Sequence, residues 1–212
     1  MAVAHSARTS AAGRPRSSSR AMIAEAAAEL FLERTYPGTT VDDIARRAGV
    51  SRATFFNYFG AKSDLLWLEV DEALAAFDGT LASAPADAAP MDAVLDALTR
   101  LADGFGPGRL PLAVTQVELM GTDAELQASA LPRFLALVRR LQAFIAARAG
   151  LEPDALLPRA AATAVVGAAV SAAAAWARAG VRRGPLTPLV RTAVAPVCAG
   201  YAPVLHGSSG SR

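Results

Sequence analysis

Residues 39–66 read TTVDDIARRAGVSRATFFNYFGAKSDLL, with two short helical segments separated by a glycine. Thr40 and Ser51 each stand where a helix N-cap is expected, just before an apolar-periodic segment. Gly49 lies between the two segments and allows the chain to bend sharply there. The stretch therefore predicts a helix-turn-helix over about residues 40–60.

The outward side chains of the second helix have the chemistry of nucleic-acid recognition. Arginine pairs bidentately with guanine and asparagine with adenine, while hydroxyl groups bind phosphate oxygens. The same residues are also compatible with an ordinary solvated helix face. The outward residues are Arg52, Thr54, Asn57 and Tyr58, whereas Ile44, Ala45, Val50 and Phe55 are spaced to pack inside the bend.

Charge is unevenly distributed along the chain. The net charge of the 212 residues is only +2, but residues 1–62 hold nine basic and five acidic residues. The remainder holds twelve basic and fourteen acidic residues. The N-terminal part is therefore where a polyanion is expected to bind.

Composition argues against most enzyme classes. The chain has one cysteine, Cys198, and two histidines, His5 and His206, which lie near its ends. A disulfide framework, a cysteine-rich zinc site and histidine-based catalysis are thereby excluded, and a cytoplasmic location is expected. We expect no catalytic residue, no metal and no cofactor.

Helical periodicity predicts an all-α fold of about nine helices, because period-two apolar runs are absent. The helix at 123–149 is expected to be interrupted around Pro132. The predicted helices cover residues 17–34, 41–48, 52–59, 62–81, 91–105, 109–121, 123–149, 153–180 and 186–204.

Residues 160–177 carry no charge and reach the length of a transmembrane helix. They consist mainly of alanine and contain no leucine, isoleucine or phenylalanine, which is a poor composition for spanning lipid. We therefore favour a buried helix that packs closely through small side chains, and expect no membrane partner.

The helix-turn-helix stretch closely resembles the DNA-binding signature of TetR-family transcriptional regulators. The matching pattern is T-x-x-x-I-A-x-x-A-G-V-S, T-F-F-x-Y-F and K-x-x-L, within residues 17–70. The FF-x-YF variant followed by Trp67 is similar to a subgroup that includes regulators of mycofactocin systems. The resemblance implies an N-terminal three-helix DNA-binding domain and a C-terminal helical domain for effector binding and dimerisation.

The resemblance also implies roles for individual residues of the first domain. Three departures from the family pattern are Phe56 in place of tyrosine, Tyr58 in place of histidine and Ala61 in place of a capping serine. The residues implied to contact phosphates are Thr40, Ser51, Thr54, Tyr58 and Lys62. Those implied to lie near the bases are Arg52, Ala53 and Asn57. Phe56 belongs to the same surface but lacks the hydroxyl of the usual tyrosine.

Four segments follow from this organisation. Residues 1–16 are expected to form a flexible basic arm, and residues 207–212 a disordered tail. Residues 17–62 are expected to bind DNA. Residues 63–206 are expected to bind the effector and the second subunit.

The C-terminal domain offers candidates for both of its implied functions. The apolar candidates named below are also compatible with an ordinary core. Arg133, Arg139 and Arg140 could bind an anionic ligand group or form a solvated basic face. The predicted dimer surface comprises Ala164, Ala168, Ala172, Trp176, Leu189, Val190, Val197 and Tyr201, and the predicted effector pocket comprises Phe77, Leu98, Phe105, Val117, Met120, Phe134 and Val138.

We therefore expect a homodimeric repressor that binds a palindromic double-stranded DNA operator and responds to a small, largely apolar or acyl-bearing effector. The alternative is a helical module that binds a protein or a membrane surface without DNA function. A helical enzyme is disfavoured because the C-terminal part shows no convergent acid–base pair.

Overall fold

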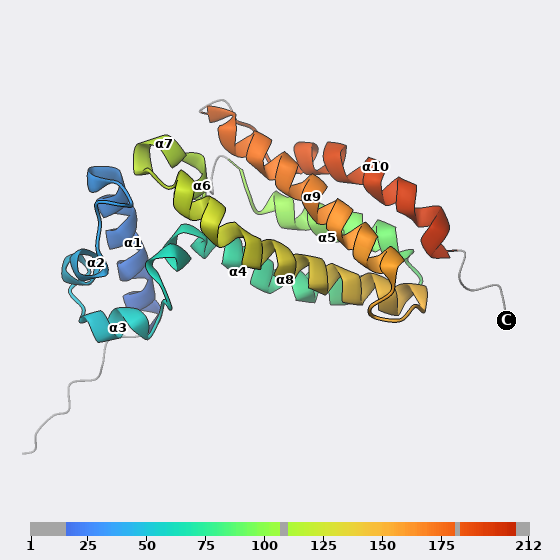
Figure 1. Ribbon diagram of the computed structural model, residues 1–212, viewed down its shortest axis with the longest axis horizontal. Coiled ribbons are helices and arrows are strands. Elements are labelled where there is room, and N and C mark those ends of the chain that lie inside the picture. The colour runs from blue at the N-terminus through green and yellow to red at the C-terminus, as the bar shows by residue number, and fades with distance from the viewer. Residues whose placement is uncertain (1–15, 107–109, 181–182, 207–212) are drawn as a thin grey trace, which may run out of the picture. The chain divides into compact units, whose positions relative to one another are not determined.

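The computed structural model describes residues 16–106, 110–180 and 183–206, which form ten α-helices, one short 3-10 helix and no β-strand (Figure 1). This confirms the predicted all-α class. The chain divides into two compact units, one that ends at Leu65 and one that begins at Leu66. The predicted arm and tail lie outside the described residues, apart from Arg16, which begins the first helix.

The first unit, called the head below, is a three-helix unit in which the second helix packs against the other two. Its helices are α1 (Arg16–Arg34), α2 (Val41–Arg47) and α3 (Arg52–Phe56). Apolar side chains from all three helices are buried, namely Ile23, Leu30, Phe31, Ile44 and Phe55. This small core holds the bend between α2 and α3.

The second unit, called the body, contains the remaining seven α-helices. Its largest helix pairs are α9 with α10, α5 with α10 and α8 with α9, around one apolar core. The helices are α4 (Leu68–Ala82), α5 (Pro90–Asp103), α6 (Leu112–Thr115), α7 (Val117–Met120), α8 (Asp123–Ala149), α9 (Leu156–Arg178) and α10 (Thr187–His206).

Two predicted helices of the body are broken in the structure. The helix predicted for 62–81 consists of a 3-10 helix, η1 (Lys62–Leu66), followed by α4, with the break at Trp67. The Trp67 indole donates a hydrogen bond to the Ser129 hydroxyl at 2.8 Å, a long-range contact that local propensity does not encode. The helix predicted for 109–121 divides into α6 and α7 at Gln116, whose φ of −119° and ψ of 39° are not helical.

The interruption predicted at Pro132 was wrong. Helix α8 runs continuously through Pro132, which lies on its exposed face, where water can bind the carbonyl that loses its helical partner. The helix predicted for 52–59 is also shorter, because Asn57 is the C-cap of α3.

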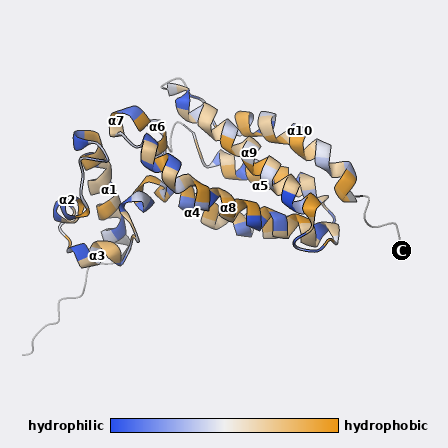
Figure 2. Cartoon of the chain, in the orientation of Figure 1, coloured by the Kyte–Doolittle hydropathy of each residue, from blue (hydrophilic) through white to orange (hydrophobic). Residues whose placement is uncertain are grey.

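Helix α9 and residues 187–205 of α10 are long and apolar enough to cross a membrane by length and composition alone. Core helices of soluble proteins pass the same test, and 33% of the apolar window of α9 and 22% of that of α10 are buried. Side chains of α9 such as Ala161, Ala162, Val165 and Val166 are fully buried in the body core. Figure 2 shows few strongly hydrophilic positions along α9 and α10. One face of α9 is thus buried, as favoured from the sequence, while its other face is not.

Cys198 on α10 is buried, and burial, with a further contribution from Asp92, raises the pKa of its thiol to about 11. Since the thiolate is the reactive form, we expect Cys198 to be nearly inert at pH 8. A thiol-reactive dye should label the native protein far more slowly than the same protein in guanidinium chloride. Equal labelling rates would contradict the buried position of Cys198.

Candidate functional site

The entry to α2 is held by a complete capping box. The Asp43 amide donates to Thr40 Oγ1 at 3.1 Å, while the Thr40 amide and hydroxyl donate to the Asp43 carboxylate at 3.1 and 2.6 Å. These hydrogen bonds, those from Thr40 Oγ1 foremost, lower the pKa of Asp43. The Thr40 hydroxyl is therefore part of the fold of the head as well as a candidate phosphate ligand.

The turn between α2 and α3 needs its glycine. Gly49 has a φ of +66°, in the left-handed region that glycine enters without strain. The next amide, Val50 N–H, donates to the Ala45 carbonyl at 2.9 Å and closes the turn. The structure thus contains the bend that the sequence predicts.

Helix α3 begins at a side-chain cap. The Ser51 hydroxyl accepts the Thr54 amide at 3.0 Å, and the two hydroxyl groups are 2.8 Å apart. Phe55 is fully buried and contacts the ring of Phe59, with 5.6 Å between centroids. The cap and the buried ring fix which face of α3 points outward.

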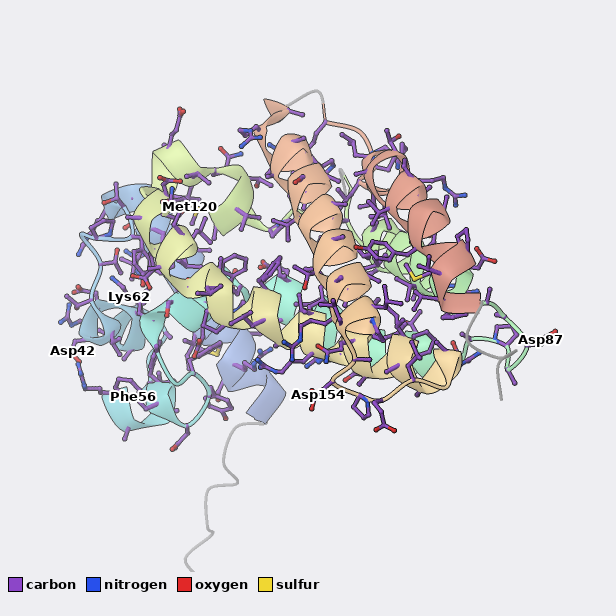
Figure 3. The ribbon with its side chains drawn as sticks, turned by 45° about the vertical axis from the view of Figure 1, so that its right-hand side comes forward. Asp42, Phe56, Lys62, Asp87, Met120 and Asp154 are labelled. Carbon is purple, nitrogen blue, oxygen red and sulfur yellow. The ribbon has the colours of Figure 1, made fainter. Side chains whose placement is uncertain are left out.

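The structure places all nine predicted DNA-contacting residues in the head or at the start of η1. Asp42, Phe56 and Lys62 of this region are labelled in Figure 3. The exposed members are Thr40, Ser51, Arg52, Ala53, Phe56 and Asn57, and the half-buried members are Thr54, Tyr58 and Lys62.

Arg52 is held in place by two neighbours. Its Nη1 donates to the Asp42 carboxylate at 2.8 Å, and its guanidinium lies over the Phe56 ring, 5.3 Å from the centroid. Both partners of the ion pair are more than half exposed, so the pair adds little stability. Its main effect is to orient the guanidinium. Asp42 was not identified as a site residue from the sequence.

Lys62 has a structural role that the family pattern did not reveal. Its Nζ donates to the carbonyls of Tyr36 and Thr39 at 2.8 and 2.7 Å and lies 3.9 Å from the centre of the Tyr36 ring. These contacts bind η1 to the turn that follows α1. Its contact with a DNA phosphate stays a prediction.

A second structural tie joins α1 and α2. Arg47 donates to both oxygens of Glu33 at 3.0 and 2.8 Å and to Glu29 at 2.9 Å. The hydrogen bond from Arg47 lowers the pKa of Glu33, and those to Glu33 and Glu29 raise the pKa of Arg47. The only sequence signal was the spacing of the two glutamates by one helical turn.

The body contains a pocket of about 190 Å³ between α4 and α8. None of the seven predicted effector residues lines it. Phe77, Leu98, Phe105 and Val138 are buried in the body core, Phe134 packs against that core, Met120 is buried, and Val117 is half-buried. The pocket is instead lined by Leu74, Ala75, Ala136, Leu137, Asp71, Arg133 and Arg140.

The four α9 residues of the predicted dimer surface do not all lie on one face of the helix, so only some of them are at the surface of the body. Steps of four residues advance about 400° around an α-helix, so each residue is turned by about 40° from the one before it. Ala164 and Ala168 are half-buried, but Ala172 and Trp176 are buried in the body core. On α10, Val190 is buried, Val197 and Tyr201 are half-buried, and Leu189 is exposed.

Two families of known proteins match this chain, one in the N-terminal part and one in the C-terminal part. Residues 23–67 match the bacterial regulatory proteins of the tetR family, and residues 88–202, more than half of the chain, match the MftR C-terminal domain of these regulators. The chain belongs to the TetR family.

Two relatives of this chain are named as transcriptional regulators. A protein named as the mycofactocin biosynthesis transcriptional regulator MftR of Mycobacterium tuberculosis is 29% identical over 166 residues, covering 78% of this chain and 83% of the relative. The HTH-type transcriptional regulator TcmR of Streptomyces glaucescens is 31% identical over 133 residues, covering 60% of this chain and 59% of the relative.

A solved structure shares the TetR fold. The repressor NalD of Pseudomonas aeruginosa has a TM-score of 0.58 at 20% identity, covering 88% of this chain and 98% of NalD. TetR-family proteins are DNA-binding transcriptional regulators rather than enzymes, which confirms the function class predicted from the sequence. The alternative of a helical module without DNA function is thereby set aside.

In this TetR-family head, Arg52→Ala is expected to cost about 1–3 kcal/mol of specific binding per half-site and to relax the preference at one base pair. Asp42→Asn should relax the same preference, because it frees the guanidinium, and should raise non-specific affinity, because it removes a charge that repels phosphate. Binding-site selection with each variant is the measurement. Arg100→Ala, an exposed arginine of the body, is the control. Selection of the wild-type motif by Arg52→Ala would show that Arg52 reads no base.

Proposed function

We propose that this TetR-family protein is a repressor that binds a palindromic operator as a homodimer and is released by a small, largely apolar or acyl-bearing effector. Residues 17–62 are proposed to read the operator. Residues 63–206 are proposed to bind the effector and the second subunit. A cytoplasmic location follows from this function.

The single observation that carries the proposal is the outward face of α3. Its cap at Ser51 and its anchor at Phe55 leave Arg52 and Asn57 exposed on one short helix. These two side chains have the donor and acceptor patterns that match guanine and adenine edges in the major groove. A second helix of a helix-turn-helix enters the groove with such residues foremost.

The uncharged surface of α9 and α10 supports a homodimer. The two helices pack side by side (Figure 1), and no charged residue occurs between Arg159 and Arg178 on α9 or from residue 192 to the end of α10. Small and uncharged side chains of this kind allow helices of two subunits to approach closely without burying a charge. Exposed or half-buried positions on this surface are Thr163, Gly167, Val170, Ser171, Leu189, Thr192, Pro196 and Gly200.

The α4–α8 pocket supports a largely apolar effector. Four of its seven lining residues are leucine or alanine, and the polar ones are Asp71, Arg133 and Arg140. Ligand pockets commonly combine an apolar wall with a few oriented polar groups. An effector that binds one conformation of the body more tightly than another would change operator affinity.

Selection of binding sites from random DNA tests the proposal. The expected motif has two half-sites related by two-fold symmetry, with centres about one helical turn or a multiple of it apart. The slope of log affinity against log salt should also match several phosphate contacts. Failure to enrich any motif, or enrichment of one asymmetric half-site, would contradict a homodimeric operator-binding repressor.

A further inference from the structure

Four side chains join the start of α4 to α8 and form what we call the α4–α8 cluster: Trp67, Asp71, Ser129 and Arg133. Arg133 donates to Asp71 through Nε at 2.8 Å and through Nη2 at 2.7 Å, a bidentate pair. The Arg133 guanidinium also lies 5.1 Å from the centre of the Trp67 ring, and the Trp67 indole donates to Ser129. The start of α4 is therefore attached to α8 through Arg133 and through the hydrogen bond from Trp67 to Ser129.

The α4–α8 pocket opens directly beside this cluster, since Asp71 and Arg133 are two of its walls. Arg140, about two turns further along α8, donates to the Leu74 carbonyl at 2.9 Å and lies 3.7 Å from Asp78. The pocket thus has two guanidinium groups and one carboxylate among its lining residues. Each guanidinium faces an aspartate, so an anion can bind at this end only in exchange for one of these carboxylates.

The Arg133–Asp71 pair is suited to exchange. Their side chains are 21% and 39% exposed, so the carboxylate of Asp71 is within reach of solvent. A guanidinium binds any carboxylate in the same two-pronged geometry. A ligand carboxylate in the pocket can therefore take the place of Asp71 on Arg133, which also changes the surroundings of the Trp67 ring that the guanidinium covers.

The size of the pocket sets the class of ligand. Its volume of about 190 Å³ lies below the roughly 300–1,000 Å³ typical of sites for drug-sized ligands. Leu74 and Leu137 form apolar walls beside the two arginines. This space suits a short aliphatic or aromatic acid.

We propose that the α4–α8 pocket binds a small apolar carboxylate, which displaces Asp71 from Arg133 and releases the first turn of α4 from α8. The regulatory part of this inference rests on the proposed function. Helix α4 begins three residues after the end of the head at Leu65, so the released turn is the part of the body to which the head is covalently attached. Release is expected to lower operator affinity.

Trp67 provides a readout of binding that needs no DNA. The chain has two tryptophans, and the other, Trp176, is buried and donates to the Gly184 carbonyl. In a Trp176→Phe background, titration with hexanoate or benzoate should change the fluorescence of Trp67 with saturation. Hexanamide and benzamide, which have the same shape without the charge, should bind at least about tenfold more weakly. Equal binding of acid and amide would overturn the carboxylate site.

Variants of the pair test the exchange itself. Arg133→Gln should weaken hexanoate or benzoate binding by about tenfold to a hundredfold, the worth of a charged hydrogen-bonded pair. Asp71→Asn should tighten it, because the competing carboxylate is gone. Arg139→Gln removes the same charge from α8 at an exposed position outside the pocket and should change nothing. Weaker binding by Asp71→Asn, or no fluorescence change with either acid in the parent protein, would overturn the proposal.

Operator affinity separates this inference from the proposed function. In the parent protein hexanoate or benzoate should weaken operator binding, and in Asp71→Asn operator binding should be weaker from the start and respond less to the acid. Binding of the acid through Arg133 with unchanged operator affinity would overturn release of α4. Absence of any operator would contradict the proposed function and leave the binding results for the pocket standing.

Discussion

Val170→Asp is expected to dissociate the dimer and to weaken operator binding by about 10²- to 10⁴-fold, the contribution of the second linked head. Val170 is 51% exposed in the uncharged surface of α9. In a two-fold dimer the substitution places two unpaired carboxylates in an apolar interface, which is strongly unfavourable. Sedimentation of the variant and titration of the operator are the measurements.

Two matched variants distinguish loss of the interface from loss of the fold. Leu131→Asp introduces the same charge at a 60% exposed position on α8 and should leave the dimer intact. Ala172→Asp, one residue of the predicted dimer surface, should unfold the body, because Ala172 is buried in its core. A Val170→Asp protein that remains a dimer would place the interface on another surface.

The head was predictable because its determinants are local. The N-caps at Thr40 and Ser51 and the glycine at position 49 lie within twelve residues of one another, and each acts on its nearest neighbours. The predicted contact residues likewise form one continuous stretch of sequence. Asp42 was missed because its importance depends on the direction of the Arg52 side chain, which the sequence does not reveal.

The body was predictable in class but not in detail, because its decisive contacts are long-range. Trp67 ends η1 through a hydrogen bond to a residue 62 positions later, and the α4–α8 pocket depends on a pair with the same separation, Asp71 and Arg133. The sequence around an apolar helical residue does not show whether its side chain lies in the core, in a ligand pocket or at a subunit interface. The predicted pocket residues were therefore assigned mainly to the core by the structure.

Lys62→Met is expected to lower the free energy of unfolding of the head by about 3 kcal/mol, since hydrogen bonds from a charged group contribute about 1.5–3 kcal/mol each. The substitution removes two of them, to the carbonyls of Tyr36 and Thr39, and leaves both carbonyls without this donor. Tyr36 itself is buried, which makes the loss harder to compensate with water. Hydrogen exchange of the amides of α1 to α3 in the full chain is the measurement.

Arg46→Met is the matched control, because it also removes one positive charge from the head. Arg46 is exposed and forms an ion pair with Asp43 one turn earlier on α2, so exchange should remain close to that of the parent protein. The family resemblance implies a different result for Lys62, namely native protection together with a salt slope flattened by roughly 0.9 per lost phosphate contact. Faster exchange of the head amides in Lys62→Met before any DNA is added would establish the structural role. Unchanged exchange with a flattened slope would show that Lys62 acts through the DNA backbone.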